Sequence, residues 1–372
     1  RGAGTKGARV PHPDEPAAIE LRAFELATAA EDDLAALAVL HDALRREVDP
    51  DDAPVTVAEV RGALVGLAAV REIAVDGVWA RSGARIVGEA LTFAPVDTDN
   101  PHLLQVELRV APDARRRGIG TRLAHWVLGV ARRRGRSLVI GGTSGVVPGA
   151  EDFARALGAR EGMRFRTNEL DLSAHEQRLF APDGLVARWC AEGPGRAPDY
   201  ELFWLPHPVP EAERAALADA KSAMNDAPRG DLQVEDRRYT AQSIADMDAY
   251  AAARGDEAWT LVARPRAGGA YAGFTDLYWN AKNPHLAFQG DTAVLPAHRG
   301  HALGKWLKAA MLARLRSERP QVRRIRTGNA DTNAAMLAIN DALGFAVTRV
   351  GTAWQVETDA LAERLGAMEA TD

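Results

Sequence analysis

The feature of this chain that most restricts its possible folds is an internal repeat. The segment from Glu107 to Gly120 (ELRVAPDARRRGIG) and the segment from Asp291 to Gly304 (DTAVLPAHRGHALG) align without a gap at an offset of 184 residues, about half of the 372-residue chain. An acidic residue, a valine, a proline, an arginine and the final glycine occupy matching positions in both segments. This spacing predicts a duplicated unit, and the chain is long enough for two domains that each have a core.

Each copy of the repeat stands between strand-like and helix-like segments. Apolar, strand-like segments precede it at residues 78–81, 85–93 and 103–110, and at 259–264, 271–278 and 286–294. Behind the first copy, apolar residues recur at helical spacing, as at Ile119, Leu123 and Val127. A short strand and a further helix are predicted next, at 137–141 and 150–157 in the first half and at 322–327 and 332–343 in the second.

A helix is also predicted upstream of the first strands. Leu34, Leu37 and His41 recur on one face of it, followed by further apolar residues at the same spacing. Thr28 and Glu31 have the spacing of a capping box, in which two side chains satisfy free amides at the start of a helix. The predicted order of elements is therefore helices, a strand run, a loop, a helix, a strand, a helix and final strands, twice over.

Glycines and prolines gather near the middle of the chain, within residues 173–198. Such a cluster favours turns and loops over regular structure, so we expect the boundary between the two units there. The predicted domains are residues 17–180 and 199–372. Each is expected to have an α/β (α+β) fold with a mixed, largely antiparallel sheet flanked by helices.

The composition excludes several classes of protein. Hydrophobic residues make up 47% of the chain and charged residues 26%, which is the balance of a folded globular protein. A net charge of −5 argues against a protein that coats nucleic acid, and no apolar run approaches the roughly 18 residues that span a membrane. The one cysteine, Cys190, excludes a disulfide framework and fits the cytoplasm. No spacing of metal ligands stands out, so we expect no metal, nucleic-acid or membrane partner.

The repeated loop has the features of an anion-binding turn. A strand ends at Val110, and a helix begins near Ile119 with unpaired amides and the positive end of its dipole. Gly118 and Gly120 let a ligand approach the backbone, and three arginines add positive charge, which together suit a pyrophosphate. The alternative is a tight strand-to-helix turn with solvated arginines. Neither the Walker sequence nor a dinucleotide fingerprint is present.

The motif Arg115-Arg-Arg-Gly-Ile-Gly120 resembles the Arg/Gln-x-x-Gly-x-Gly/Ala signature of the Gcn5-related N-acetyltransferase (GNAT) superfamily. The second half looks like the same family, with Arg299-Gly-His-Ala-Leu-Gly304 and, further on, Asn333 and Gly344-Phe345. The resemblance covers about residues 20–172 and 200–358, and the whole chain looks like the tandem acetyltransferases common in actinomycetes, a group that includes mycothiol synthase. It implies two acyl-CoA N-acyltransferase domains packed as a pseudo-dimer, in a monomer or a homodimer.

The resemblance also implies where acetyl-CoA, the expected acyl donor, would bind. In this family the amides of the loop hold the pyrophosphate, and the pantetheine arm enters between two splayed parallel strands, here 103–110 with 137–141 and 286–294 with 322–327. Backbone amides of the first strand would polarise the thioester carbonyl. The predicted cofactor-binding residues are Val110, Arg115, Arg116, Arg117, Gly118, Ile119, Gly120 and Thr121 in the first half, and Val294, Arg299, Gly300, His301, Ala302, Leu303, Gly304 and Asn333 in the second.

Two carboxylates are candidates for the general base that removes a proton from the attacking amine. Glu107 and Asp291 occupy matching positions, three residues before the valine that ends each strand. The alternative is a solvated carboxylate or one paired with an arginine. Many family members carry an Asn early in the last helix and a Tyr seven residues later as acid; Asn333 fits the first place, but Asn340 stands at the second.

The predicted function is acetyl-CoA-dependent N-acetylation of a primary amine of a small molecule, by direct attack on the thioester. Two alternatives stay open: acetylation of a protein or peptide amine, and acyl-CoA binding without catalysis. The sequence does not identify the acceptor, the acyl chain length, the general acid or the half that performs the chemistry. Acceptor-binding residues are expected in the segments at about 48–77 and 206–239.

Overall fold

The computed structural model describes residues 18–96 and 99–370, so the predicted domain start at residue 17 lies outside the described residues. Strands of both halves join one mixed twelve-stranded sheet in the order β1-β2-β3-β4-β5-β12-β6-β11-β10-β9-β8-β7. The strands are β1 Ile19–Phe24, β2 Ile73–Ser82, β3 Arg85–Pro95, β4 Leu103–Val110, β5 Leu138–Ser144, β6 Arg160–Asp171, β7 Tyr200–Leu205, β8 Asp256–Pro265, β9 Gly273–Asn280, β10 Leu286–Val294, β11 Arg324–Ala330 and β12 Ala346–Glu357.

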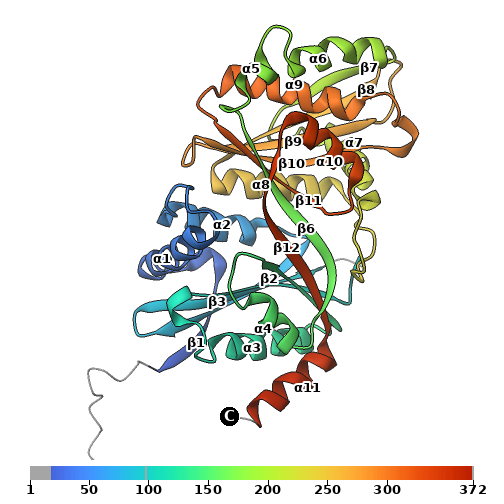
Figure 1. The fold of residues 1–372 in the computed structure, drawn as a ribbon. Helices are drawn as coiled ribbons and strands as arrows, with labels where there is room; N and C mark the ends of the chain where they lie inside the picture. The colour runs from blue at the N-terminus through green and yellow to red at the C-terminus, as the bar shows by residue number, and fades with distance from the viewer. Residues whose placement is uncertain (1–17, 97–98, 371–372) are drawn as a thin grey trace, which may run out of the picture.

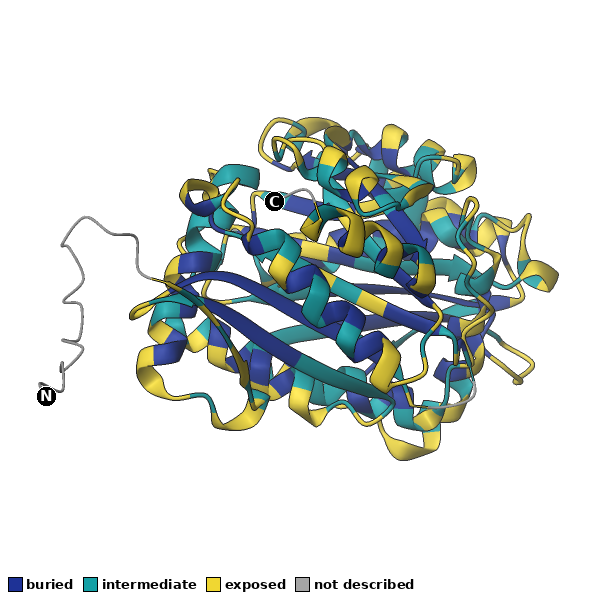
Figure 2. Ribbon diagram, turned by 90° about the horizontal axis from the view of Figure 1, so that it is seen from below, coloured by how far each residue is buried: buried dark blue, intermediate teal, exposed yellow. Residues whose placement is uncertain are grey.

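Helices cover both faces of this sheet, whose strands are mostly buried (Figures 1 and 2). The helices are α1 Glu31–Val48, α2 Val57–Ala69, α3 Ile119–Arg133, α4 Ala150–Ala156, α5 Glu176–Phe180, α6 Leu185–Arg196, α7 Glu211–Lys221, α8 Ala241–Arg254, α9 Leu303–Glu318, α10 Ala334–Leu343 and α11 Thr358–Glu369. Neighbouring residues of β3 show the two faces: a Cβ at Gly88 would lie 3.1 Å from Ile119 of α3, whereas Glu89 bonds to His41 of α1. Between the halves, α2 packs on α8.

The last strand of each half pairs with the other half. Strand β6 runs antiparallel to β11, from Arg324 opposite Asp171 to Ala330 opposite Phe165. Strand β12 pairs with β5 on one edge and with β6 on the other, so the two strands cross the middle of the molecule (Figure 1). Helix α11 follows β12 and places Leu361 in the hydrophobic core of the first half, against α3.

The structure agrees with the predicted mixed sheet and with most predicted strands and helices, but three local expectations were wrong or incomplete. Thr28 does not cap α1, because Ala30 occupies the N-cap and offers no side-chain oxygen. The capping box instead joins Thr56 to Glu59 at the start of α2, a helix for which no bounds were predicted.

The glycine- and proline-rich segment within residues 173–198 is helical in part, because α6 continues through Pro194. Gly193 serves packing there: a Cβ at this residue would lie 2.4 Å from the ring of Trp306 on α9. Helices α5 and α6 thus cover the core of the second half. The domain limits 17–180 and 199–372 stay a prediction, since β6 and β12 each pair with strands of the other half.

Candidate active site

Both copies of the repeated loop have the same backbone conformation. In the first half a short 3-10 helix (Pro112–Ala114) leads to Arg116 with φ 62° and to Gly118 with φ 71°, the N-cap of α3. In the second half Gly300 has φ 87° and Ala302, the N-cap of α9, has φ 58°. A left-handed backbone costs a residue with a side chain about 1–2 kcal/mol, so Arg116 and Ala302 are held by the rest of the turn.

This conformation leaves the first amides of the following helix without backbone partners. In the first half the earliest helical bond runs from the amide of Arg122 to the carbonyl of Gly118 at 3.0 Å, so the amides of Ile119, Gly120 and Thr121 are free among the described residues. A Cβ at Gly118 would meet nothing within 4 Å, so the space before these amides is open. The turn therefore presents the amide hydrogens that an anion needs.

In both halves the arginine that follows the last valine of the strand has a structural role. Arg115 donates from Nε to the carbonyl of Val110 at 3.2 Å and from its two Nη atoms to Glu47 of α1, both at 2.6 Å. Arg299 donates likewise to the carbonyl of Val294 at 3.0 Å and to Asp226 at 2.6 Å. Both guanidinium groups brace the turn against the strand end and a carboxylate, so they position the loop rather than face an empty space.

The remaining predicted loop residues differ between the halves. Arg116 and Arg117 are exposed and form no ion pair in the described part of the chain, so their charge is available to an anion. A Cβ at Gly120 would lie 3.1 Å from the ring of Phe153, so this glycine allows α3 to pack on α4. In the second half the ring of His301 lies 5.4 Å from that of Tyr200.

The parallel strands in each half separate beside the turn. Strands β4 and β5 pair from Leu103 opposite Leu138 only as far as Val106 opposite Gly141. Beyond this point β4 continues to Val110 against β3, and β5 continues to Ser144 against β12. The split therefore begins in the sheet and opens toward the amide-lined turn that follows β4, as expected from the sequence.

In the second half the split begins earlier and is accompanied by a bulge. Strands β10 and β11 pair only from Leu286 to Phe288, and the hydroxyl of Thr327 donates to the carbonyl of Gln289 at 3.2 Å across the widening gap. The register of β10 with β9 shifts between Gln289 and Thr292, whereas β4 pairs with β3 without such a shift. A bulge leaves backbone groups unpaired, so the two splits offer different amides to a ligand.

The predicted base Glu107 lies in a chain of charged side chains on the α1 face of the sheet. Glu107 forms an ion pair with Arg109, whose Nη1 donates to Glu89 at 2.9 Å. Glu89 has no exposed surface and also bonds to Nε2 of His41 at 2.8 Å. Burial opposes its ionisation, but the hydrogen bond and charge of His41, together with Arg109, lower the pKa of Glu89 below its ordinary value.

His41 and Glu89 were not predicted as functional residues. A signal existed for His41, because it interrupts the apolar face of the helix at 31–48. A single polar residue on such a face has to find a buried partner or reach the surface. Glu89 gave the same signal within a buried strand, but its partner on another element could not be read from the sequence.

The matching carboxylate of the second half, Asp291, is held by a buried lysine. Nζ of Lys221 lies 3.4 Å from Asp291 and 2.6 Å from Asp276, which also accepts a hydrogen bond from Thr260 at 2.7 Å. Burial opposes the charge of Lys221, but the two carboxylates outweigh it and raise its pKa above the ordinary value. Both predicted bases are therefore ion-paired, with 49% of the Glu107 side chain and 41% of the Asp291 side chain exposed.

The positions of the family's Asn and Tyr hold a polar network in the second half. The side chain of Asn333 accepts from the amide of Met336 at 3.3 Å and caps α10. Asn340, at the tyrosine place, is buried and accepts from Nζ of Lys308 at 2.8 Å. Burial without a nearby carboxylate lowers the pKa of Lys308 to about 7.

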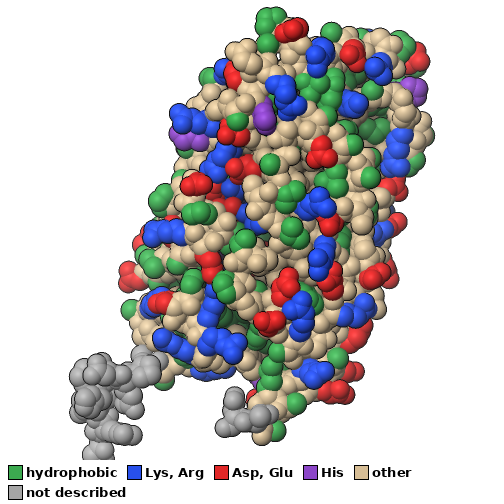
Figure 3. All heavy atoms as spheres, viewed as in Figure 1, with side chains coloured by type: hydrophobic (Ala, Val, Ile, Leu, Met, Phe, Trp, Pro, Cys, Tyr) green, Lys and Arg blue, Asp and Glu red, His purple; other side chains and the backbone are tan. Residues whose placement is uncertain are grey.

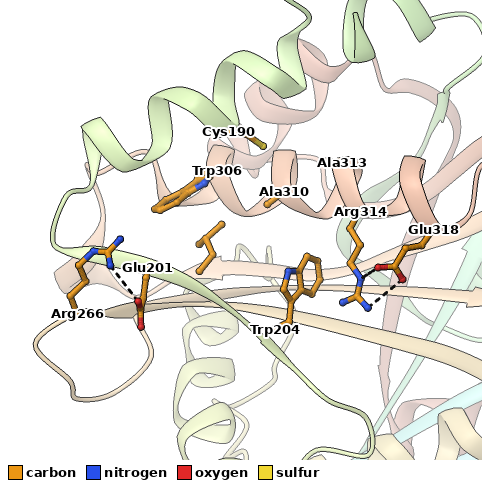
Figure 4. A pocket seen from close by; sticks show the side chains of 10 residues that line it. Cys190, Glu201, Trp204, Arg266, Trp306, Ala310, Ala313, Arg314 and Glu318 are labelled. Atoms are coloured by element: carbon orange, nitrogen blue, oxygen red, sulfur yellow. Dashed lines mark hydrogen bonds and ion pairs between the residues drawn. The ribbon is translucent and has the colours of Figure 1, made fainter. Parts of the chain in front are cut away.

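A separate groove lies on the outer face of the second half. It has a volume of about 770 Å³ and lies between α6, α9 and β7, with Trp306 and Trp204 along it and ion pairs at each end (Figure 4). None of its lining residues belongs to the turns at residues 115–120 and 299–304 or to strands β4, β5, β10 and β11. The groove is therefore not the predicted donor site. Cys190 lies there, and burial raises the pKa of its thiol, which disfavours the reactive thiolate.

Two further searches cover only the described residues. No group of three or more His, Cys, Asp or Glu side chains in residues 18–96 and 99–370 is placed to hold a metal ion. In the same ranges, every helix is too short or too polar to cross a membrane. On the face seen in Figure 3, acidic and basic side chains are interspersed and form no continuous basic surface.

The sheet is mixed, and in each half two of its parallel strands split beside an amide-lined turn. This repeated arrangement defines the class of protein as an N-acyltransferase with two similar domains. Comparison with known families supports this class directly. The model of the acetyltransferase (GNAT) family matches residues 19–159. The family model thus covers most of the first half, and the whole chain has the architecture of a tandem GNAT acetyltransferase.

Solved structures give the similarity over nearly the whole chain. A tandem GNAT protein from the clavulanic acid biosynthesis pathway is 28% identical, with 92% of this chain and 99% of that chain covered and a TM-score of 0.73. A GCN5-related N-acetyltransferase from Sphaerobacter thermophilus is 17% identical over 91% of this chain and 96% of that chain, with a TM-score of 0.63. No curated protein matches in sequence. The expected similarity to mycothiol synthase stays a prediction.

Proposed function

We propose that this acetyltransferase transfers the acetyl group of acetyl-CoA to a primary amine of a small molecule, and that the first half holds the reacting donor. One observation carries the proposal: the open turn at Gly118, with free amides at Ile119, Gly120 and Thr121, lies where β4 and β5 separate. Free amides at a helix start suit a pyrophosphate, and a split between parallel strands suits an extended arm that ends in a thioester.

The chemistry follows from these groups. The exposed charges of Arg116 and Arg117 add to the attraction for the pyrophosphate. Amide hydrogens of β4 beyond Val106 have lost β5 as a neighbour, and one of them could stabilise the negative charge on the thioester oxygen as the amine attacks. Because a thiol has a pKa of about 8.5, the coenzyme can leave as thiolate without a strong acid.

The second turn is proposed as a weaker donor site. It has the same backbone conformation as the first turn, but the left-handed conformation of Ala302 is energetically unfavourable. The side-chain oxygen of Asn333 is occupied in capping α10. Glu107 and Asp291 remain candidate bases, and each forms an ion pair with a cationic side chain.

A similar protein with a known biosynthetic pathway supports a small-molecule acceptor. The tandem GNAT protein that is 28% identical to this chain comes from the biosynthesis of clavulanic acid, which is a small molecule. A single cysteine, Cys190, is compatible with a reducing compartment such as the cytoplasm.

Isothermal titration with acetyl-CoA tests the donor site. Gly118→Val should weaken binding about tenfold or more, because a β-branched residue disfavours the left-handed conformation that aims the amides. Gly135→Val is the matched control: Gly135 has φ 63° and open surroundings, but it follows the far end of α3. If both variants bound acetyl-CoA as the wild type does, the turn would not be the donor site.

A further inference from the structure

The ion pair of Glu107 leaves another side chain free to accept a proton on the same face of the sheet. Arg109 lies between Glu107 and Glu89 and bonds to both, so the charge of Glu107 is already compensated. His41 lies at the other end of this chain of bonds, and in the described part of the chain its ring bonds to Glu89 and to no cationic side chain.

The buried carboxylate fixes which nitrogen of His41 can accept a proton. Glu89 also accepts a hydrogen bond from Nη1 of Arg109 at 2.9 Å, and a carboxylate paired with a guanidinium in this way only accepts hydrogen bonds. The bond of 2.8 Å therefore requires a hydrogen on Nε2 of His41, which leaves the lone pair of the neutral imidazole on Nδ1. In the described part of the chain Nδ1 has no hydrogen-bond partner, and 24% of the side chain is exposed.

The helix that carries His41 is fixed to the donor turn. Glu47, six residues further along α1, holds both Nη atoms of Arg115 at 2.6 Å. Six residues of helix rise about 9 Å along the axis, so His41 and Glu47, which bonds to Arg115 of the turn, are carried by the same helix fewer than two turns apart. His41 and the turn are therefore held in a fixed relation by helix α1.

The elements that pack against α1 also carry charged side chains. Strand β3 contributes Glu89, and β4 contributes Arg109 and Glu107. Helix α2, which also packs on α1, contributes Glu59, whose charge is paired with Arg45 at 2.5 Å. The carboxylate in contact with the imidazole is Glu89, which fixes the orientation of the ring.

We propose that His41, oriented by Glu89, is the general base of the first half, an inference that rests on the proposed acetyl transfer. Nδ1 removes a proton from the acceptor ammonium, and the neutral amine attacks the thioester carbon. The nitrogen–carbon bond forms as the carbon–sulfur bond breaks, and the sulfur leaves with the electron pair as thiolate. The second proton, lost by nitrogen as the amide forms, ends on the thiolate. Glu89 is a positioning residue, since it acts through the imidazole.

The test compares His41→Gln, Glu107→Gln and the control His285→Gln, whose native ring bonds only to the backbone carbonyl of Gln321. Thiol release from acetyl-CoA is followed from pH 5.5 to 9 with ethanolamine, glucosamine, spermidine and lysine methyl ester as the acceptors. His41→Gln should lower kcat about 100-fold and abolish the fall in rate at acidic pH. Binding of acetyl-CoA, measured by titration, should stay unchanged in it.

Glu89→Gln adds a readout that packing alone would not change. Nitrogen-15 spectra of the imidazole at alkaline pH should show hydrogen on Nε2 in the wild type and a mixture of the two tautomers in the variant. Wild-type rates in His41→Gln, or loss of the acidic limb in Glu107→Gln instead, would overturn the assignment of the base and leave the transfer intact. If the wild type bound acetyl-CoA but released no thiol with any amine, the proposed function itself would fail.

Discussion

Lys308 carries a charge into the core of the second half, where it is only 2% exposed. Its ammonium donates to the side-chain oxygen of Asn340 and pairs with no carboxylate of the described residues, while the ring of Phe345 lies 5.6 Å away. An ammonium that loses water and gains only an amide is destabilised, which is why its pKa falls from 10.5 to about 7.

This pKa predicts how stability should change with pH. Between the folded pKa of about 7 and the unfolded value of 10.5, the unfolded chain binds the proton that the folded chain has lost. The free energy of unfolding of the wild type should therefore rise with pH in that window, relative to Lys308→Met, by up to about 1.4 kcal/mol per pH unit. Below pH 7 the lysine is charged in both states, and the difference should become constant.

Urea unfolding at pH 6, 7.5 and 9 measures this slope. Lys305→Met, which removes an exposed lysine from the same helix, should run parallel to the wild type. Parallel curves for Lys308→Met as well would mean that the buried ammonium keeps its ordinary pKa.

Single residues also show the limit of sequence reasoning. The repeat located both turns, and the glycine at 118 fits the left-handed backbone that it adopts. Arg115 was predicted as a phosphate ligand from the motif, and the structure adds bonds to the strand end at Val110 and to Glu47, a residue of a helix far away in the sequence. His41 and Glu89 meet only because α1 lies on β3. Contacts of this kind depend on tertiary packing, which spacing along the chain does not encode.

At the scale of elements, α2 explains why a helix can be missed. Its sequence contains Gly62 and Gly66, which lower helix propensity by up to about 1 kcal/mol each. Both glycines face α8: a Cβ at Gly62 would lie 2.6 Å from the carbonyl oxygen of Ala253, and one at Gly66 would lie 2.8 Å from the ring of Tyr250. The close approach of α2 and α8 requires glycine at these two positions, and the same glycines weaken the helical signal in the sequence.

A pair of glycine-to-alanine substitutions tests this account. Gly62→Ala should destabilise the protein by about 1–3 kcal/mol, because the added methyl group meets the backbone of α8. Gly129→Ala, in the middle of α3, should stabilise it by up to about 1 kcal/mol, because only the flexible end of Arg133 is near and the helix gains propensity. Thermal or urea unfolding measures both. Equal effects of the two substitutions would contradict the close packing of α2 on α8.

At the scale of the whole molecule, a buried ion network joins the two halves. Asp52, which precedes α2, accepts from Arg326 of β11 at 2.7 and 3.0 Å, and Arg326 also contacts Glu169 of β6 at 3.0 Å. Burial would raise the pKa of Asp52, but the hydrogen bond and charge of Arg326, with those of Arg324, lower it. The loop between α1 and α2 is thereby fixed to a strand that forms one side of the second split.

The exchange of strands makes the first half depend on the end of the chain. A chain shortened to end at Gly344 would keep every residue of both turns, yet β5 would lose the partner that it has along its whole length. The core of the first half would also lose Val356, Leu361 and Leu365, which are 8%, 2% and 0% exposed. Each buried Leu or Val side chain contributes roughly 1.5–3 kcal/mol, which together is a large part of the stability of a domain.

We therefore expect the shortened chain to lose acetyl-CoA binding at the first turn, measured by titration, together with the unfolding transition of the first half. A chain that ends at Glu357 is the graded comparison, because it keeps β12 and lacks only α11. Its affinity should lie between those of the wild type and the shorter chain, since β5 stays paired while Leu361 and Leu365 are lost. Unchanged binding and melting in the chain that ends at Gly344 would show that the first half folds without its exchanged strand. The pseudo-dimer would then be two independent units joined by a linker, instead of one sheet that neither half can complete.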